Sequence, residues 1–149
     1  MSQLVQLATP QDAARVLPLV ARFHESQSIP LDEAARDGAV LPLLDGNPLG
    51  AIWLIGPRQA PVGYIALSFG WSIEHGGMEG RIDQFYIREK IRGRGMGSET
   101  LSALVPQLRD AGLVALHLDV TQKSEAAARL FKRMGFRLRD DLNRMSWTA

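Results

Sequence analysis

The chain of 149 residues contains no cysteine. A disulfide framework is therefore excluded, and a reducing compartment is favoured. No apolar run approaches the roughly 20 residues that a membrane-spanning helix requires. The N-terminus also lacks the basic start and the continuous apolar segment of a signal peptide. We therefore expect a cytoplasmic protein with no membrane partner.

Internal repeats, low-complexity tracts and Pro/Gly/Ser-rich linkers are also missing from the sequence. A chain of this length lies at the usual size of one domain, and its 46% of hydrophobic residues can fill one core. We therefore expect a single domain that spans residues 1–149.

The formal net charge is only +1, but the charges are distributed unevenly. Residues 1–86 hold five basic and nine acidic side chains, whereas residues 87–149 hold twelve basic and seven acidic ones. A basic half suits a polyanionic ligand and an acidic half can attract an amine, although an unevenly charged solvated surface explains the pattern as well. The sequence has no aromatic-rich RNA-binding strand and no long basic helix, so we expect no nucleic acid partner.

The most informative segment runs from Arg81 to Leu101, where an apolar strand, a basic glycine-rich turn and a helical pattern follow one another. Glycines let the backbone approach an anion, and the free N–H groups of a helix's first turn can point at phosphates. Arginines in the turn can add charge-assisted hydrogen bonds. We predict a pyrophosphate site, with a plain basic surface turn as the alternative, at Arg92, Gly93, Arg94, Gly95, Met96, Gly97 and Ser98.

The spacing of the turn narrows the choice of phosphate ligand. No Lys-Ser or Lys-Thr pair follows the glycines, so the turn is not a nucleoside-triphosphate loop. A dinucleotide fingerprint needs G-x-G-x-x-G, but Ser98 stands at the third glycine, and only Asp119 at a strand end keeps a Rossmann alternative open. Read as Arg92-x-x-Gly95-x-Gly97, the turn resembles the R/Q-x-x-G-x-G/A motif of the GNAT superfamily of acyl-CoA N-acyltransferases.

The resemblance extends over residues 82–136. Ile87 stands five positions before Arg92, where the family has a valine-like strand end. Residues 113–120 match a following strand, and residues 124–136 resemble the helix motif N-x-x-A-x-x-L-Y-x-x-x-G-F. The helix departs from the motif twice, because serine replaces asparagine and phenylalanine replaces tyrosine at Ser124 and Phe131.

Hydrophobic periodicity gives the order β-α-α-β-β-β-α-β-α-β-β, which matches the GNAT architecture. The resemblance implies an α/β (α+β) fold with a mixed, mostly antiparallel sheet of six to seven strands flanked by about four helices. We expect Pro106 to kink or shorten the helix after the turn. The expected strands include residues 4–7, 51–55, 62–71, 83–87, 113–120, 136–138 and 144–148.

The resemblance also implies chemistry: transfer of an acetyl group from acetyl-CoA to a primary amine of a small molecule or peptide. Backbone N–H groups of Phe85, Tyr86 and Ile87 would hold the pantetheine arm and polarise the thioester carbonyl, as an oxyanion hole does. Ser124 and Phe131 would also contact the cofactor. A central strand with no other role fits residues 85–87 equally well.

For the general base, Asp83 is our first candidate, because polyamine-acetylating relatives carry a carboxylate here in an E-D-F-F-V pattern where this chain reads D-Q-F-Y-I. Burial would have to raise its pKa towards neutrality. A pairing of Asp83 with Arg81 is the structural alternative. Strand alternation puts Asp83 on the face of Phe85 and Ile87, and Gln84 on the face of Ile82 and Tyr86. The reserve bases are Glu74, His75 and Glu79.

The proton donor is open, because Phe131 has no proton to give to the leaving thiolate. Tyr86, Tyr64 or water can take this role; otherwise the protein is a non-catalytic acyl-CoA-binding sensor or interaction module. For substrate contacts we predict Trp71, Glu74 and Gln84, with Trp53 and Phe69 as further aromatic candidates.

We expect no metal site, since no His/Cys/Asp/Glu group stands at ligand spacing, and we assign His24 and His117 to structure. The oligomeric state is left open, a homodimer included.

Overall fold

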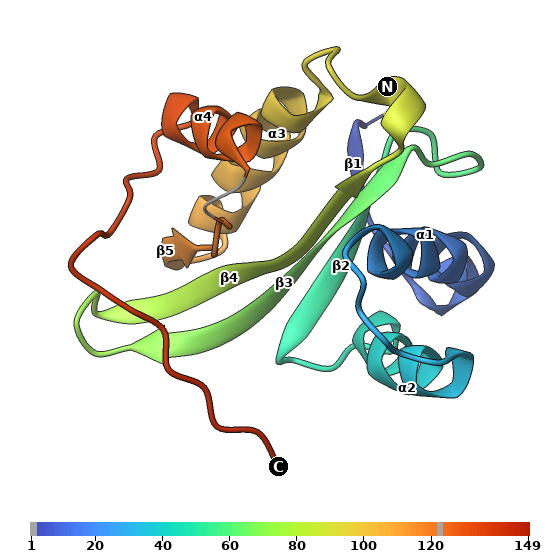
Figure 1. The fold of residues 1–149 in the computed structure, drawn as a ribbon, viewed down its shortest axis with the longest axis horizontal. Coiled ribbons are helices and arrows are strands. Elements are labelled where there is room, and N and C mark those ends of the chain that lie inside the picture. The colour runs from blue at the N-terminus through green and yellow to red at the C-terminus, as the bar shows by residue number, and fades with distance from the viewer. Residues whose placement is uncertain (1–2, 122–123) are drawn as a thin grey trace. The chain divides into compact units, whose positions relative to one another are not determined.

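The computed structural model describes residues 3–121 and 124–149. Contacts between residues divide the chain into two compact units, Met1–Asp119 and Val120–Ala149, and each unit is described by itself. The first unit carries one sheet with helices on both of its faces, and the second carries a single helix (Figure 1). The expectation of one domain stays a prediction.

Five strands form the sheet, in the spatial order β1-β2-β3-β4-β5. Each of the first three neighbouring pairs is antiparallel, and β5 joins β4 in parallel. The predicted element order holds as far as the last helix, and the predicted mixed sheet is confirmed. The strands are β1 (Val5–Leu7), β2 (Gly50–Ile55), β3 (Gly63–Ser72), β4 (Gly77–Ile87) and β5 (Leu113–His117).

The expectation of six to seven strands is wrong for the described part of the chain, because residues 136–138 and 144–148 are not strands. The helix α4 (Glu125–Arg133) is followed by Gly135 in the left-handed region, with φ of +94°. Beyond it Arg139 forms an ion pair with Asp141, two residues away. Two aspartates and an asparagine within residues 140–143 disfavour strand pairing at this point.

Helices cover both faces of the sheet within the first unit (Figure 1). The helices α1 (Ala13–Ser26) and α2 (Glu33–Leu44) lie on one face, and α3 (Met96–Asp110) lies on the other. Pro106 does not end α3, which continues for one more turn. Among the described residues, no helix has the length and apolarity that a bilayer crossing demands.

The alternation of side chains along the strands explains this layering. Ile52 and Leu54 of β2, with Tyr64 of β3 and Tyr86 of β4, belong to the core cluster that α1 and α2 complete. Intervening residues such as Ile65 are equally buried and, by the same alternation, face the opposite side of the sheet. The helical side of the main cluster comes from Val16, Leu19, Val20, Val40 and Leu44.

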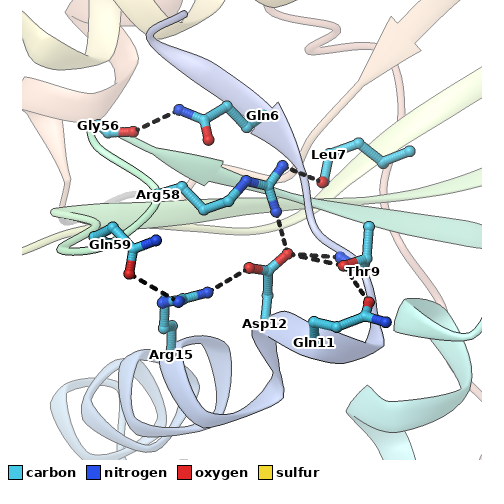
Figure 2. Close-up of polar contacts among 9 residues, drawn as sticks. All are labelled: Gln6, Leu7, Thr9, Gln11, Asp12, Arg15, Gly56, Arg58 and Gln59. Carbon is cyan, nitrogen blue, oxygen red and sulfur yellow. Dashed lines mark hydrogen bonds and ion pairs between the residues drawn. The ribbon is translucent and has the colours of Figure 1, made fainter. Parts of the chain in front are cut away.

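A buried carboxylate anchors the start of α1 (Figure 2). Asp12, in the 3-10 turn Pro10–Asp12, accepts a hydrogen bond from the Thr9 N–H at 2.8 Å and ion pairs with Arg15 at 2.8 Å. It also ion pairs with Arg58, whose guanidinium donates to the Leu7 carbonyl at 3.1 Å. One carboxylate thus joins β1, the entry to α1 and the loop after β2.

These contacts shift the titration of Asp12. Burial raises its pKa, but the Thr9 N–H and the Arg58 guanidinium outweigh burial, so the pKa lies below the ordinary 3.8. A carboxyl whose pKa is lower in the folded state stabilises the fold at a pH above its unfolded pKa. That stabilisation is lost as the pH falls through the folded value.

We predict that Asp12→Asn lowers the free energy of unfolding at pH 7 by about 1–3 kcal/mol, because the Thr9 N–H and Arg58 lose their charged acceptor. Between pH 6 and pH 3 the wild-type protein should lose more stability than this variant. Urea unfolding at both pH values measures the difference, with the exposed Asp110→Asn as the control. An equal loss in wild type and Asp12→Asn would contradict the assignment.

Candidate functional site

The glycine-rich turn lies between the end of β4 and the start of α3, as the sequence predicts. A short 3-10 turn, Glu89–Ile91, leaves the strand, and α3 begins at Met96. Gly93 and Gly95 have φ of +81° and +78°, the left-handed region that L side chains rarely adopt. Nothing lies within 4 Å of the position that a Cβ would take at either glycine. The turn is therefore open on its outer side.

The N-terminus of α3 supplies donors to this open space. The N–H of Glu99 bonds to the Gly95 carbonyl at 3.0 Å, which closes the first helical turn. The preceding N–H groups, those of Met96, Gly97 and Ser98, have no acceptor within the helix by its geometry. They point out of the positive end of the helix dipole, where anions are stabilised. The predicted turn residues are thus brought together at one helix end.

Arg92 fastens the turn to the strand that precedes it. Its Nε donates to the Ile87 carbonyl at 2.8 Å, and its guanidinium carbon lies 5.6 Å from the centre of the Tyr86 ring. The contact with Tyr86 is a cation–π interaction. Arg92 itself is exposed, so its remaining donors can reach a ligand phosphate.

Gly63 controls the path of β4 just before the turn. It pairs with Ile87, and a Cβ at this position would lie only 2.1 Å from the Tyr86 carbonyl oxygen. Two strands can approach this closely only where one residue has no side chain. The absence of a side chain at Gly63 therefore allows the end of β4 to pack closely against β3.

β5 pairs along its whole length with the beginning of β4 only. Their pairs run from Met78↔Leu113 to Arg81↔His117, and no pair follows Arg81 in the described part of the chain. On its other edge β4 stays paired with β3 as far as Ile87, and the Arg88 N–H continues the ladder to Val62 at 2.8 Å.

Because antiparallel backbone groups alternate between the two edges, the N–H of Ile87 points to the edge away from β3. The last part of β4 thus directs backbone groups toward an edge along which the described residues provide no paired strand, because β5 ends at His117. Arg92 already takes the Ile87 carbonyl on this edge, and the Ile87 N–H remains as a donor for a ligand.

A β-bulge displaces Asp83. Gln84 pairs with Ala66, but Ile82 pairs with the next residue of β3, Leu67, so Asp83 is the extra residue. The bulge moves Ile82 to the face opposite Gln84, and the expectation that these two share a face is wrong. Asp83 is exposed, so the burial that our sequence argument required for this base is not present.

Gln84 belongs to a polar network beneath α1. Its Oε1 accepts from the Tyr64 hydroxyl at 2.7 Å, and its Nε2 lies 3.1 Å from Nε2 of His24. An amide nitrogen can only donate, so Nε2 of His24 is the acceptor and the imidazole proton lies on Nδ1. Nδ1 is buried and has no partner among the described residues. The sequence analysis assigned His24 a structural role but could not indicate this network, because the three side chains of the network come from α1, β3 and β4.

Burial governs the titration of the network. It lowers the pKa of His24 below the ordinary 6.5, an effect that Gln84 and Asp83 partly offset and Arg36 reinforces. Burial also raises the pKa of the Tyr64 hydroxyl far above its ordinary value, with Asp83 and Tyr86 adding to the shift. The Tyr64 hydroxyl therefore stays protonated and donates a hydrogen bond to Gln84. For this reason Tyr64 is a poor source of a proton for a thiolate.

Tyr86 lies in the same aromatic layer. Its ring centroid is 6.1 Å from that of Phe23 and 6.2 Å from that of Tyr64. It also borders an open cleft of about 750 Å³ between the end of α1 and the strand end. The cleft is lined by Arg22, Glu25, Ser26, Ala60, Pro61, Val62, Arg88, Glu89, Lys90 and Ile91 as well.

Two predicted substrate residues, Trp71 and Glu74, lie away from the turn. Trp71, which is 73% exposed, pairs with Met78 at the far end of β4, about 30 Å from Ile87 along the strand. Glu74 is in the exposed β3–β4 turn beside it. Ser124 and Phe131 belong to the second unit, where the Phe131 ring packs on Phe136 at 5.4 Å and the Ser124 side chain makes no capping hydrogen bond. Their predicted roles stay predictions.

Three comparisons with known proteins bear on this arrangement. The chain is 28% identical over 131 residues to the aminoalkylphosphonate N-acetyltransferase of Salmonella typhimurium, covering 87% of this chain and 82% of that protein. It is 30% identical over 63 residues to the spermine/spermidine N(1)-acetyltransferase of Bacillus subtilis, covering 42% of this chain and 41% of that protein. A crystal structure of an integron cassette protein from the mobile metagenome of Cole Harbour Salt Marsh superposes with a TM-score of 0.84 at 31% identity, covering 98% and 91% of the two chains.

The model of the acetyltransferase (GNAT) family matches residues 13–136, which include the strand, the glycine-rich turn and the helix described above. The predicted resemblance is thereby confirmed over most of the chain, and this protein belongs to the GNAT family of acetyltransferases.

Proposed function

We propose that this acetyltransferase moves an acetyl group from acetyl-CoA to a primary amine of a small molecule or peptide. The observation that carries the proposal is the combination of the open glycine turn, the N-terminus of α3 and the edge of β4 that is unpaired beyond Arg81 among the described residues. The names of two relatives, which act on aminoalkylphosphonates and on polyamines, support a small amine as the acceptor.

The residues present fit coenzyme A. A pyrophosphate needs backbone donors and space, and the turn offers both: left-handed Gly93 and Gly95 with no neighbour at their Cβ positions, beside a helix N-terminus. Arg92 and Arg94 add positive charge. The Ile87 N–H is a donor for the pantetheine arm or for the thioester oxygen, in the manner of a strand edge that receives an extended ligand.

When bound, acetyl-CoA supplies the acetyl group as an activated thioester. The amine nitrogen must lose a proton before its lone pair forms the C–N bond, and Asp83 is our proposed acceptor for that proton, directly or through water. Its position on the bulge exposes the carboxylate, so an incoming ammonium can reach it. As the C–S bond breaks, the sulfur takes a proton from Tyr86 or from water.

Phe131 is the reason to consider a second function, which is binding of acyl-CoA without catalysis. Where the family's helix motif carries a tyrosine, this residue has no proton to donate, which suits a protein that binds acyl-CoA without transferring the acyl group. Turnover with any amine eliminates this alternative. Tight binding of acetyl-CoA without turnover across many amines supports it.

Calorimetric titration with acetyl-CoA, with NAD as the control ligand, tests the cofactor site. We predict that Gly95→Ala weakens acetyl-CoA binding about tenfold or more, because a side chain in the left-handed region costs roughly 1–2 kcal/mol and occupies the open turn. Gly46→Ala is the matched control, since Gly46 has φ of +87° and an equally open Cβ position in the turn after α2. Equal affinity in Gly95→Ala and wild type would remove the turn from the site.

We predict that Asp83→Asn lowers kcat by about 10²–10⁴-fold with little change in acetyl-CoA affinity, because an amide cannot take the ammonium proton. Release of free thiol in the presence of a panel of primary amines measures kcat, and calorimetry measures affinity. Asp110→Asn, at the exposed end of α3, serves as the charge-matched control. An undiminished kcat would assign the base to another group.

We predict that Phe131→Tyr raises the turnover rate by restoring a phenol where the family motif has one. The same thiol-release assay measures the change, and the acetyl-CoA affinity of both proteins should agree within a few fold. If the rates are equal, Tyr86 or water already delivers the proton, and Tyr86→Phe then distinguishes between these two sources.

A further inference from the structure

Three potential metal ligands converge at the end of the sheet away from the glycine turn. His75 lies in the β3–β4 turn, Glu79 in β4 and His117 at the end of β5. One ligand atom from each side chain lies within 4.8 Å of the other two. Among the residues that the structure describes, no other group of three histidine or acidic side chains meets this criterion. The sequence could not indicate it, because the ligands are brought together by the pairing of β4 with β5.

The contacts within this group orient the side chains toward a common point. Nε2 of His117 lies 2.8 Å from a carboxylate oxygen of Glu79. The rings of His75 and His117 have centroids 5.5 Å apart. Ser72 Oγ lies 3.1 Å from Nδ1 of His75 and accepts from the His75 backbone N–H at 2.9 Å. This contact holds Nδ1 of the ring and leaves Nε2 for an ion, as outer partners do for metal-bound histidines.

Two imidazole nitrogens and one carboxylate oxygen are a donor set for a transition metal. Zinc sites with two histidines and one glutamate leave a fourth position for water, with bonds of about 2.0–2.1 Å and ligand atoms about 3.3 Å apart. The 2.8 Å pair and the 4.8 Å limit bracket that separation, so rotation of exposed or half-buried side chains is enough to close the site. Mg²⁺ and Ca²⁺ prefer oxygen ligands and fit poorly.

The position of the group gives it a structural consequence. Arg81↔His117 is the last registered pair, at the residue where β5 ends, and Glu79 is two residues earlier on β4. Arg81 forms an ion pair with Asp119 at 2.5 Å, so its charge is offset beside the site. An ion held by all three ligands would join the β3–β4 hairpin to the last residue of β5.

We propose that His75, Glu79 and His117 form a site for one Zn²⁺ ion, which clips the end of β5 to the β3–β4 hairpin. The site is distinct from the acetyl-transfer region and does not depend on the proposed reaction. In this proposal His75 and Glu79 are metal ligands, and no longer the reserve candidates for the general base that the sequence analysis named. The competing explanation is an ion pair between Glu79 and His117 with no metal, and this explanation predicts no saturable binding.

The test uses the full-length protein without a histidine tag, freed of metal by a chelator and titrated with Zn²⁺ in a calorimeter. We expect one ion per chain, at micromolar affinity or tighter, and a rise in Tm on adding Zn²⁺. His75→Ala, His117→Ala and Glu79→Gln should each weaken Zn²⁺ binding at least tenfold and abolish the rise in Tm. Mg²⁺ should give neither signal.

His24→Gln is the matched control, because His24 is the third histidine of the chain and lies buried in α1, in contact with Gln84. It should bind Zn²⁺ as the wild type does. Co²⁺ should give the absorption of a low-coordinate site in wild type and lose it in His75→Ala. Absence of saturable Zn²⁺ binding, or equal affinity in the three ligand variants and the control, would overturn the proposal. His75 is exposed, so His75→Ala decides the question even if Glu79→Gln does not fold.

Discussion

β4 is the strand on which the whole of the first unit depends. It pairs antiparallel with β3 along nearly its full length, yet parallel with β5 over its first residues only. A parallel neighbour requires a crossover, and α3 provides it, so the N-terminus of α3 must lie beside the end of β4. The turn is therefore a consequence of this change in pairing direction, and it lies next to the part of β4 whose outer edge is unpaired among the described residues.

The two sides of β4 have different chemical properties. On the side of α1, Tyr64, Gln84 and His24 form a buried chain of hydrogen bonds that holds the strand against the helix. The bulge interrupts the alternation at Asp83 and brings a carboxylate to the surface. Buried networks of this kind specify one arrangement of a core. The strand thus carries a hydrogen-bonded network with a protonated phenol on one side and an exposed carboxylate at the bulge.

The sequence predicted the local features well. Strand, glycine turn and helix are consecutive in the chain, so their spacing alone identified the turn and the family. What it missed depends on pairing between distant segments. The bulge at Asp83 arises from the register with β3, and the contacts of His24 and of His75 with Glu79 and His117 join different elements. The two closing strands were wrong because a motif-based expectation was extended into residues 136–149, which form no strand.

The glycines near the site limit sequence change in two different ways. At Gly63 the constraint is volume, since even a methyl group would overlap the Tyr86 carbonyl oxygen. At Gly93 and Gly95 the protein's own atoms leave the surrounding space open, and the protein itself restricts only the backbone conformation. Asparagine and aspartate enter the left-handed region most easily among the other residues. Either residue could therefore keep the backbone of the turn but would place a side chain in the space of the proposed ligand, whereas at position 63 any side chain would overlap the protein itself.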